Sequence, residues 1–409
     1  MRALIVSQYY WPEGFPINDI VKTMAQTGVE VEVLTGKPNY PQGRIYEHYR
    51  AWGCQREYHD GILVHRIPLL ARGRGAVRLA MNYLSFVATG LLLAPWLLRK
   101  RQFDIVFVYA PSPILQALPA LFLAWLKGCP SVLWVQDLWP ESLSATGHVR
   151  NKTVLALVER VVRYIYRHMD LLLVQSEAFI APVRQLAGGT PVVYHANSAA
   201  QAVLATGPAV TPSISGLGEG FSVMFAGNIG TAQAVDVIIV AAALLRDEAA
   251  IQFVVLGDGS RRAWMIEQVA ALGLRNVHLP GRFPMEMMPH VMQKASVLLV
   301  TLADQEIFRL TVPSKIQAYL AAGRPILACL NGEGAKLVAR AGAGLTVPAG
   351  DGPALAEAVL RLYRMSGQER DAMGANGGRY YAAHFSHDKL VARLNDLLRS
   401  CIVERKQQV

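Results

Sequence analysis

One stretch in the C-terminal half of the chain carries residue types suited to binding phosphate. Pro313 fixes φ and lacks an N–H, which suits the first turn of a helix, and Ser314 and Lys315 follow it. Apolar residues then recur at helical spacing until Gly323 ends the pattern. Unpaired N–H groups and the positive end of a helix dipole attract anions, so this helix start is a candidate phosphate site. The alternative is an ordinary helix with a solvated lysine.

Glycines follow three successive apolar runs that precede this helix. They lie in 227-GNIG-230, 257-GDGS-260 and 281-GRF-283. Glycine after a strand lets a ligand approach the backbone and lets N–H groups converge. Together with the helix at Pro313, these glycines predict a nucleotide diphosphate site. The sequence has no D-x-D and no metal-ligand cluster, so we expect Lys315 and helix N–H groups, without a metal, to balance the phosphate charge.

Two places in the N-terminal half offer carboxylates at the ends of apolar runs. In 134-WVQDLWPESL-143, Asp137 directly follows a predicted strand and could orient or deprotonate a hydroxyl, whereas capping the next helix is the alternative. For Glu141, capping of that helix is favoured over a catalytic role. Earlier, the loop 9-YYWPEGFPIND-19 follows the first strand and could turn Glu13, Gly14 and Asn18 towards a ligand. A plain structural loop is an equal alternative there.

The elements that position these residues read as α/β. Short apolar runs alternate with helical stretches throughout both halves, and runs without polar alternation suit parallel strands covered on both faces. The sequence predicts a first doubly wound domain over residues 1–204 and an Ala/Gly/Pro/Ser-rich linker over 205–220. A second doubly wound domain is predicted over 221–380, followed by a C-terminal helical segment over 381–409 that continues it.

Composition favours contact with a membrane surface over nucleic acid. The 409 residues are 52% hydrophobic with a formal charge of +10, and residues 1–205 hold 20 Lys and Arg against 13 Asp and Glu. Basic and apolar character in one half suits an anionic lipid surface. The four cysteines are far apart and predict free thiols in a reducing cytoplasm. The start MRALIVSQYY lacks a signal-peptide pattern, so we expect a cytoplasmic protein.

A charge-free segment of twenty residues, 79–98, is long enough to span a bilayer and is bounded by arginines and a lysine. Spanning would place strands of one sheet on opposite sides of the membrane. A buried domain helix and a partly exposed helix that dips into the bilayer are the remaining alternatives. We favour the second, which predicts a peripheral or monotopic protein on the inner face of the cell membrane.

Taken together, the chain resembles the family 4 retaining glycosyltransferases of GT-B architecture. It looks like the bacterial branch for O-antigen and capsule sugars, which includes transferases for N-acetylfucosamine. The motifs that carry the resemblance are 39-NYPQG-43, 134-WVQDLWPES-142, 226-AGNIGTAQ-233, 257-GDG-259, 281-GR-282 and 313-PSKIQAYLAAGRPI-326. The resemblance implies two Rossmann-like domains facing across a cleft.

It also implies roles for individual residues. The catalytic residues would be Asp137 and Lys315, and the acceptor side would be formed by Glu13, Gly14, Asn18 and Glu141. The donor-binding residues would be Gly227, Asn228, Gly230, Gln233, Gly257, Asp258, Arg282, Phe283, Pro313, Ser314, Lys315 and Gln317. Three positions depart from the family pattern. Asn228 and Gln233 replace a basic pair of the phosphate loop, and Ala318 replaces a carboxylate that holds the ribose, for which Gln317 is our substitute.

The predicted function is transfer of a sugar, N-acetylfucosamine or another N-acetylated deoxysugar, from a UDP-sugar with retention and without a metal or other cofactor. The acceptor would be a polyprenyl-diphosphate-linked sugar of surface polysaccharide synthesis, and the partners would be this lipid and the membrane surface, without nucleic acid. A UDP-sugar 2-epimerase of the same architecture and a non-catalytic membrane-associated scaffold are the alternatives.

Overall fold

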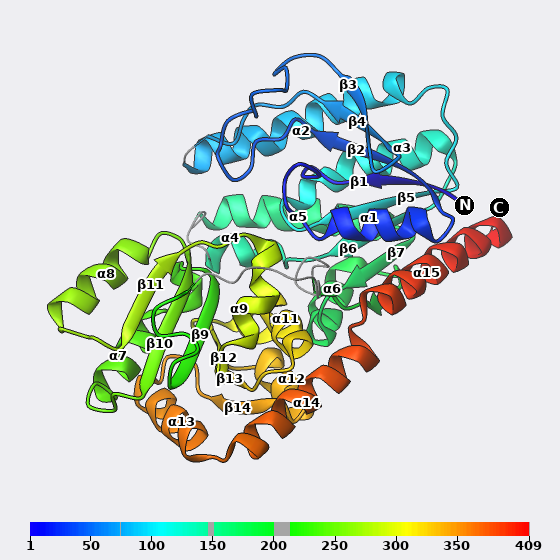
Figure 1. Cartoon of the computed structure of the whole chain (residues 1–409). Helices are drawn as coiled ribbons and strands as arrows, with labels where there is room; N and C mark the ends of the chain where they lie inside the picture. The colour runs from blue at the N-terminus through cyan, green and yellow to red at the C-terminus, as the bar shows by residue number, and fades with distance from the viewer. Residues whose placement is uncertain (74, 146–150, 200–212, 409) are drawn as a thin grey trace. The chain divides into compact units, whose positions relative to one another are not determined.

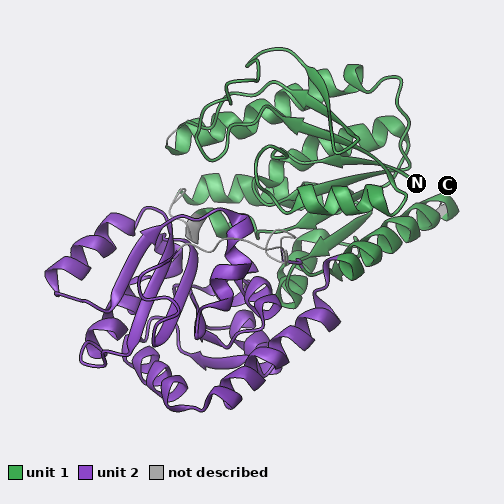
Figure 2. Ribbon diagram, viewed as in Figure 1, with its two compact units in different colours: residues 1–196, 388–409 green, residues 197–387 purple. Residues whose placement is uncertain are grey.

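The computed structural model describes all residues except 74, 146–150, 200–212 and 409. The chain forms two compact units (Figure 2): unit 1 comprises residues 1–196 and 388–409, and unit 2 comprises residues 197–387. Each unit is built on one twisted sheet with helices on its faces (Figure 1).

Unit 1 contains an eight-stranded sheet in the order β3-β4-β2-β1-β5-β6-β7-β8. Every pairing is parallel except β3 with β4. The strands are β1 (Arg2–Val6), β2 (Glu30–Gly36), β3 (Gln55–His59), β4 (Ile62–Ile67), β5 (Ile105–Ala110), β6 (Ser131–Val135), β7 (Leu171–Val174) and β8 (Val192–Tyr194). The helices are α1 (Ile17–Gln26), α2 (Ala76–Leu97), η1 (Ile114–Gln116), α3 (Ala117–Lys127), α4 (Glu141–Ala145), α5 (Lys152–His168), η2 (Glu177–Phe179), α6 (Ile180–Ala187) and α15 (His387–Gln408).

Unit 2 contains a six-stranded, all-parallel sheet in the order β11-β10-β9-β12-β13-β14. The strands are β9 (Phe221–Asn228), β10 (Ile251–Asp258), β11 (Val277–Gly281), β12 (Val297–Thr301), β13 (Ile326–Cys329) and β14 (Gly344–Val347). The helices are η4 (Thr231–Gln233), α7 (Asp236–Leu244), α8 (Arg262–Ala271), η5 (Met285–Met287), α9 (Met288–Gln293), α10 (Glu306–Leu310), α11 (Ser314–Ala322), α12 (Glu333–Arg340), α13 (Gly352–Arg364) and α14 (Gly367–His384).

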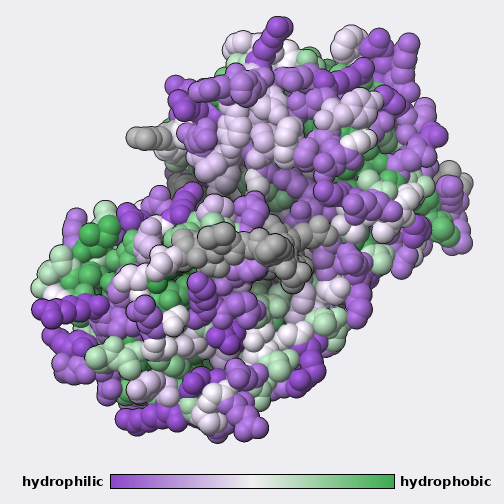
Figure 3. Space-filling view, viewed as in Figure 1, coloured by the Kyte–Doolittle hydropathy of each residue, from purple (hydrophilic) through white to green (hydrophobic). Residues whose placement is uncertain are grey.

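Apolar residues of the strands are buried against the helices that cover each sheet. The central strands β5 and, from Ala3 onward, β1 are apolar and buried because helices cover both faces, as parallel sheets require. In unit 1, alternate strand residues such as Ile5 and Phe107 pack against α1 through Val21 and against α15 through Leu398. The visible surface in Figure 3 is mostly hydrophilic, with apolar residues gathered over α8.

The predicted strands are present, with two additions. β3 and the edge strand β14 were not predicted, because β3 consists of charged and polar residues and no residue of β14 is fully buried. Helix α11 is capped by Gly323 in the left-handed conformation at φ +64°, as predicted.

The structure divides the chain at other points than the predicted boundaries. Residues 388–409 belong to unit 1 and not to the end of the second domain. The physical reason is that Leu394, Leu398 and Cys401 of α15 are buried in the core of unit 1. The predicted linker over 205–220 lies partly outside the described residues, and within its described part Ile214 and Leu217 are buried.

Candidate functional site

Lys315 lies in the first turn of α11, and its amine is buried in unit 2. No side chain caps this helix. Nζ of Lys315 lies 3.5 Å from the centre of the Phe225 ring, and among the described residues no atom accepts a hydrogen bond from it. Burial lowers the pKa of the amine to about 7. The alternative of a solvated lysine is therefore wrong.

Gly227 supplies the space that this amine occupies. A Cβ at Gly227 would lie 2.6 Å from Cε and 3.1 Å from Nζ of Lys315. The end of β9 is joined to α11 by Tyr319, whose hydroxyl accepts a hydrogen bond of 3.0 Å from the N–H of Ala226. The buried amine is therefore fixed beside the backbone of the first glycine loop.

Two neighbouring strand ends meet at these glycines. Gly257 pairs with Gly227, and Asp258 pairs with Asn228. At Gly257 a Cβ would lie 1.8 Å from the carbonyl oxygen of Gly227, and φ is +132°. Only glycine, which has no Cβ, fits this close contact and this backbone conformation. The structure thus brings the first two predicted glycine loops together with Lys315.

The loop after β9 is held by its own side chains. Nδ2 of Asn228 donates to Oε1 of Gln233 over 3.1 Å, and a Cβ at Gly230 would lie within 3 Å of both side chains. The hydroxyl of Thr301, at the end of β12, donates to the carbonyl of Gln233. The two residues that replace the basic pair of the family therefore bond each other and leave no cation in the loop.

The third predicted strand end lies at the exposed margin of this site. Arg282 follows β11 and forms an ion pair of 3.8 Å with Asp258, and both side chains are more than half exposed. Phe283 is half-buried. Oδ1 of Asp258 also accepts from the N–H of Gly259 over 2.8 Å.

At the helix start, Pro313 precedes α11 and Ser314 is its exposed first residue. Gln317 is not in the predicted place: it is 1% exposed. Its amide nitrogen, oriented to satisfy its surroundings, donates to the carbonyls of Pro313 and Ser314. Gln317 therefore does not present a group for the ribose, because its amide is used inside its own helix.

In unit 1, Asp137 lies two residues after β6 and is exposed. Helix α4 begins only at Glu141, four residues later, so Asp137 is not its N-cap. Glu141 lies in the first turn of α4, where a carboxylate suits the helix dipole.

Glu13 is buried and fixes a loop. Its Oε1 accepts from the N–H groups of Asn39, over 2.8 Å, and Tyr40, over 2.7 Å. Oε2 has no partner among the described residues, and burial raises the carboxyl pKa to about 7. Asn18 bonds the N–H of Trp11 and the carbonyl of Glu13, while Gly14 is exposed. Of the predicted acceptor loop, Glu13 and Asn18 thus hold the loop itself.

A buried amide network behind this loop was missed by sequence reasoning. Nε2 of Gln8 donates to Oδ1 of Asn82 over 2.7 Å, and the N–H of Gln8 donates to Oε1 of Gln116 over 2.6 Å. Nδ2 of Asn82 contacts Oδ1 of Asn39 at 3.5 Å. The signal in the sequence was Asn82, a strongly polar residue inside the charge-free segment.

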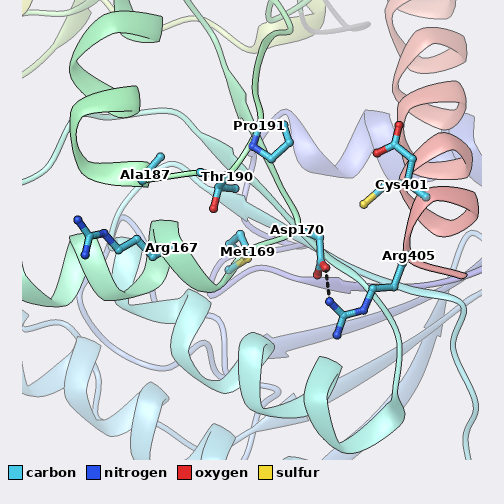
Figure 4. Close-up of a pocket in the computed structure, with 11 residues that line it drawn as sticks. Arg167, Met169, Asp170, Ala187, Thr190, Pro191, Cys401 and Arg405 are labelled. Atoms are coloured by element: carbon cyan, nitrogen blue, oxygen red, sulfur yellow. Dashed lines mark hydrogen bonds and ion pairs between the residues drawn. The ribbon is translucent and has the colours of Figure 1, made fainter. Parts of the chain in front are cut away.

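A cavity of about 550 Å³ lies elsewhere in unit 1 (Figure 4). Asp170 and Thr190 line it just before β7 and β8, so it lies at the opposite edge of the sheet from the strand ends. Arg405 of α15 bonds Asp170 across 3.0 Å, and Oδ2 of Asp170 accepts from the N–H of Ser131. These contacts attach α15 to the sheet. Among the described residues, no group of three His, Cys, Asp or Glu is placed to hold a metal ion.

Two protein families match the chain, one mainly over unit 1 and the other within unit 2. Residues 17–200 match the family described as "Glycosyl transferase 4-like domain". Residues 220–365 match the family described as "Glycosyl transferases group 1".

Curated relatives match most of the chain. It is 27% identical over 346 residues to the probable glycosyltransferase WbjE of Pseudomonas aeruginosa, covering 81% of this chain and 82% of that protein. It is 25% identical over 343 residues to the putative colanic acid biosynthesis glycosyl transferase WcaI of Escherichia coli, covering 79% and 82%.

Solved structures share the fold at low identity. Sucrose-phosphate synthase from Thermosynechococcus elongatus superimposes with a TM-score of 0.73 at 15% identity, covering 98% of this chain and 99% of that chain. Anabaena HepE in complex with UDP and glucose superimposes with a TM-score of 0.68 at 16% identity, covering 98% and 100%. The predicted GT-B fold with two Rossmann-like domains is confirmed.

Proposed function

We propose that this glycosyltransferase transfers a sugar from a UDP-linked donor to a lipid-linked acceptor. Its two units match a glycosyl transferase 4-like domain and a glycosyl transferase group 1 domain. The observation that carries this proposal is the amine of Lys315, which is buried beside Gly227 without a hydrogen-bonding partner among the described residues. A buried amine without an anion is unfavourable, and a diphosphate supplies that anion.

The donor is proposed to lie along the glycine loops of unit 2. Its diphosphate would be bound by Lys315, by the free N–H groups at the start of α11 and by the loop from Gly227 to Gly230. The nucleoside would lie towards Arg282 and Phe283. The complexes of HepE with UDP and glucose support a UDP-linked donor, because that protein shares this fold.

We propose transfer with retention and without a metal. In this reaction the bond between the anomeric carbon and the diphosphate oxygen breaks, and UDP leaves with the electron pair. The acceptor hydroxyl forms the new bond on the same face and gives its proton to a phosphate oxygen of the departing UDP. Lys315 and the helix N–H groups stabilise the charge that develops on the diphosphate. Asp137 would orient sugar hydroxyls, because its carboxyl follows a strand end and is exposed.

The acceptor is proposed to be a polyprenyl-diphosphate-linked sugar of surface polysaccharide synthesis. The description of one relative supports this class, since WcaI is a putative colanic acid biosynthesis glycosyl transferase. Within the donors, we propose N-acetylfucosamine or another N-acetylated deoxysugar, because of the motifs 39-NYPQG-43 and 313-PSKIQAYLAAGRPI-326. The protein would act at the inner face of the cell membrane.

The test is a panel of UDP-sugars incubated with the purified protein, with and without a polyprenyl-diphosphate-linked sugar. UDP release that depends on the acceptor is expected. UDP release or inversion at C2 without acceptor would indicate an epimerase, and the absence of turnover across the panel would indicate a scaffold.

Variants of the site make the test specific. Lys315→Ala is expected to lower transfer about a hundred- to a thousandfold, since one stabilising cation is lost. The matched control is Lys294→Ala, because Lys294 is an exposed lysine of unit 2 that precedes β12 at the opposite edge of the sheet. Equal losses in the two variants would contradict a role for Lys315.

A further inference from the structure

Helix α2 carries an exposed apolar stripe along its whole length. Most of the exposed large residues lie three, four or seven positions apart, so that they share one broad face of the helix. They are Val77, Met81, Leu84, Leu91, Leu92 and Trp96, which together form what we call the outer stripe. Leu92 is 76% exposed, and on the adjoining helix α3 Trp125 is 75% exposed. Soluble monomers rarely leave such a contiguous surface in water.

The opposite face of α2 is bonded to the segment that follows β4 in unit 1. Asn82 donates to the carbonyl of Leu70 over 2.6 Å, and the hydroxyl of Ser85 accepts from the N–H of Leu70. Gly90 contacts α3 so closely that a Cβ would lie 2.8 Å from Pro119. By length and composition α2 could cross a membrane, with 22% of its most apolar stretch buried. Because its inner face is tied to the fold, the helix lies on the surface of unit 1.

The charged residues that flank α2 in the sequence are all of one sign. Residues 61–103 contain seven Lys and Arg and no Asp or Glu. Arg78 lies near the start of α2, and Arg99 and Lys100 follow its end, all three exposed. The guanidinium of Arg99 lies over the Trp96 ring at 4.6 Å, an arrangement that suits the boundary between acyl chains and headgroups.

We propose that the outer stripe, with Trp125 and Leu126 of α3, docks in the interface of an anionic lipid bilayer, with α2 lying in the membrane plane. The charge pattern favours lipid over a second copy of the chain. Two copies facing each other through this surface would bring cations together, whereas anionic headgroups would pair with them. The proposal does not depend on the proposed function, because lipid binding is measured without substrates.

The test is cosedimentation of the full chain with vesicles of phosphatidylcholine alone and of phosphatidylcholine with phosphatidylglycerol. Tighter binding to the anionic vesicles is expected. The double variant Leu84→Ser/Leu92→Ser is expected to weaken binding to both at least tenfold, because two large apolar groups no longer enter the bilayer. Arg99→Gln/Lys100→Gln is expected to weaken binding roughly tenfold or more on the anionic vesicles only.

The matched control is Leu244→Ser on α7, since Leu244 is 58% exposed and Leu84 is 59% exposed. It is expected to bind like the unchanged protein. A second measurement needs no folding of a variant: brominated phosphatidylglycerol is expected to quench tryptophan fluorescence of the unchanged protein through Trp96 and Trp125. No vesicle binding and no quenching would overturn the proposal. So would a dimer in sedimentation velocity that Leu84→Ser/Leu92→Ser converts to monomers.

Discussion

Lys315 in unit 2 and Glu13 in unit 1 are both buried ionisable residues beside the carboxyl ends of strands, and both have a pKa near 7. Their surroundings differ. One oxygen of Glu13 accepts two backbone N–H groups, whereas the amine of Lys315 has only an aromatic ring as a partner among the described residues.

The difference indicates that Glu13 stabilises the fold, whereas Lys315 is suited to binding a ligand. Glu13 holds the backbone at Asn39 and Tyr40, and its contacts account for its burial. The amine of Lys315 bonds no described loop, and it occupies the space that a side chain at Gly227 would need. A buried cation that bonds no described residue of its own fold is suited to an anionic ligand.

The largest expected effect comes from removing the cation. Lys315→Met keeps an unbranched apolar chain over Phe225 and removes the unpaired amine. Transfer is expected to fall about a hundred- to a thousandfold, while the free energy of unfolding of the ligand-free protein rises by about 1–3 kcal/mol. Denaturant unfolding of both proteins without nucleotide measures the second effect.

Lys294→Met is the control, and it should change neither property because that side chain is exposed. If Lys315→Met destabilised the ligand-free protein, the amine would contribute to the fold and the comparison with Glu13 would fail.

Binding of UDP should be accompanied by uptake of protons. At pH 8 an amine with a pKa near 7 is mostly neutral, and a diphosphate beside it favours the charged form. Nearly one proton per UDP is therefore expected, measured by calorimetry in buffers with different ionisation enthalpies. At this pH the carboxyls and the diphosphate are already ionised, so they add little. Uptake that persists in Lys315→Met would assign the proton to another group.

The two residues should also make the free energy of unfolding depend on pH, in opposite directions and in different pH ranges. The pKa of Glu13 is raised from 4.5 to about 7, so its contribution is full below pH 4.5 and is lost as pH rises through 7. The pKa of Lys315 is lowered from 10.5 to about 7, so its contribution is present above pH 10.5 and is lost as pH falls through 7.

Glu13→Gln keeps an acceptor for both N–H groups and removes the charge. It is expected to abolish the fall between pH 4.5 and 7, seen as a difference in unfolding free energy from the unchanged protein. Glu13→Ala removes the acceptor as well and is expected to destabilise by about 1–3 kcal/mol at all pH values. Equal pH profiles for Glu13→Gln and the unchanged protein would show that Glu13 does not titrate in this range.

The sequence predicted the sheets well because their strands are apolar along their length. β5 and β12 are buried at every residue, so their runs stand out from the helical stretches. It failed for β3, where exposed and half-buried residues alternate in an antiparallel edge strand. For α15 it predicted a helix but not the unit in which that helix packs. The partner of α15 in unit 1 is some 200 residues or more away along the chain, and periodicity does not report which core a helix joins.

The sequence predicted which residues lie together where local pattern determines their position. The start of α11 and the glycines of β9 and β10 lie together because parallel strands end at one edge of a sheet. Gln317 was misplaced because the direction of its amide depends on carbonyls one turn away. Glu13 was placed in the right loop, but its bonds to Asn39 and Tyr40 join residues 26 and 27 positions apart.

The smallest expected effect lies at the exposed margin of the donor site, at Asp258. Asp258→Asn keeps the oxygen that accepts from the N–H of Gly259 and removes the charge opposite Arg282. Because this ion pair is 3.8 Å long and both side chains are more than half exposed, stability is expected to change by about 0.5 kcal/mol or less. Affinity for UDP, measured by calorimetry, is expected to change by about threefold at most. A tenfold loss would mean that the carboxylate binds the nucleotide directly, and charge at this margin would then matter as much as the buried amine of Lys315.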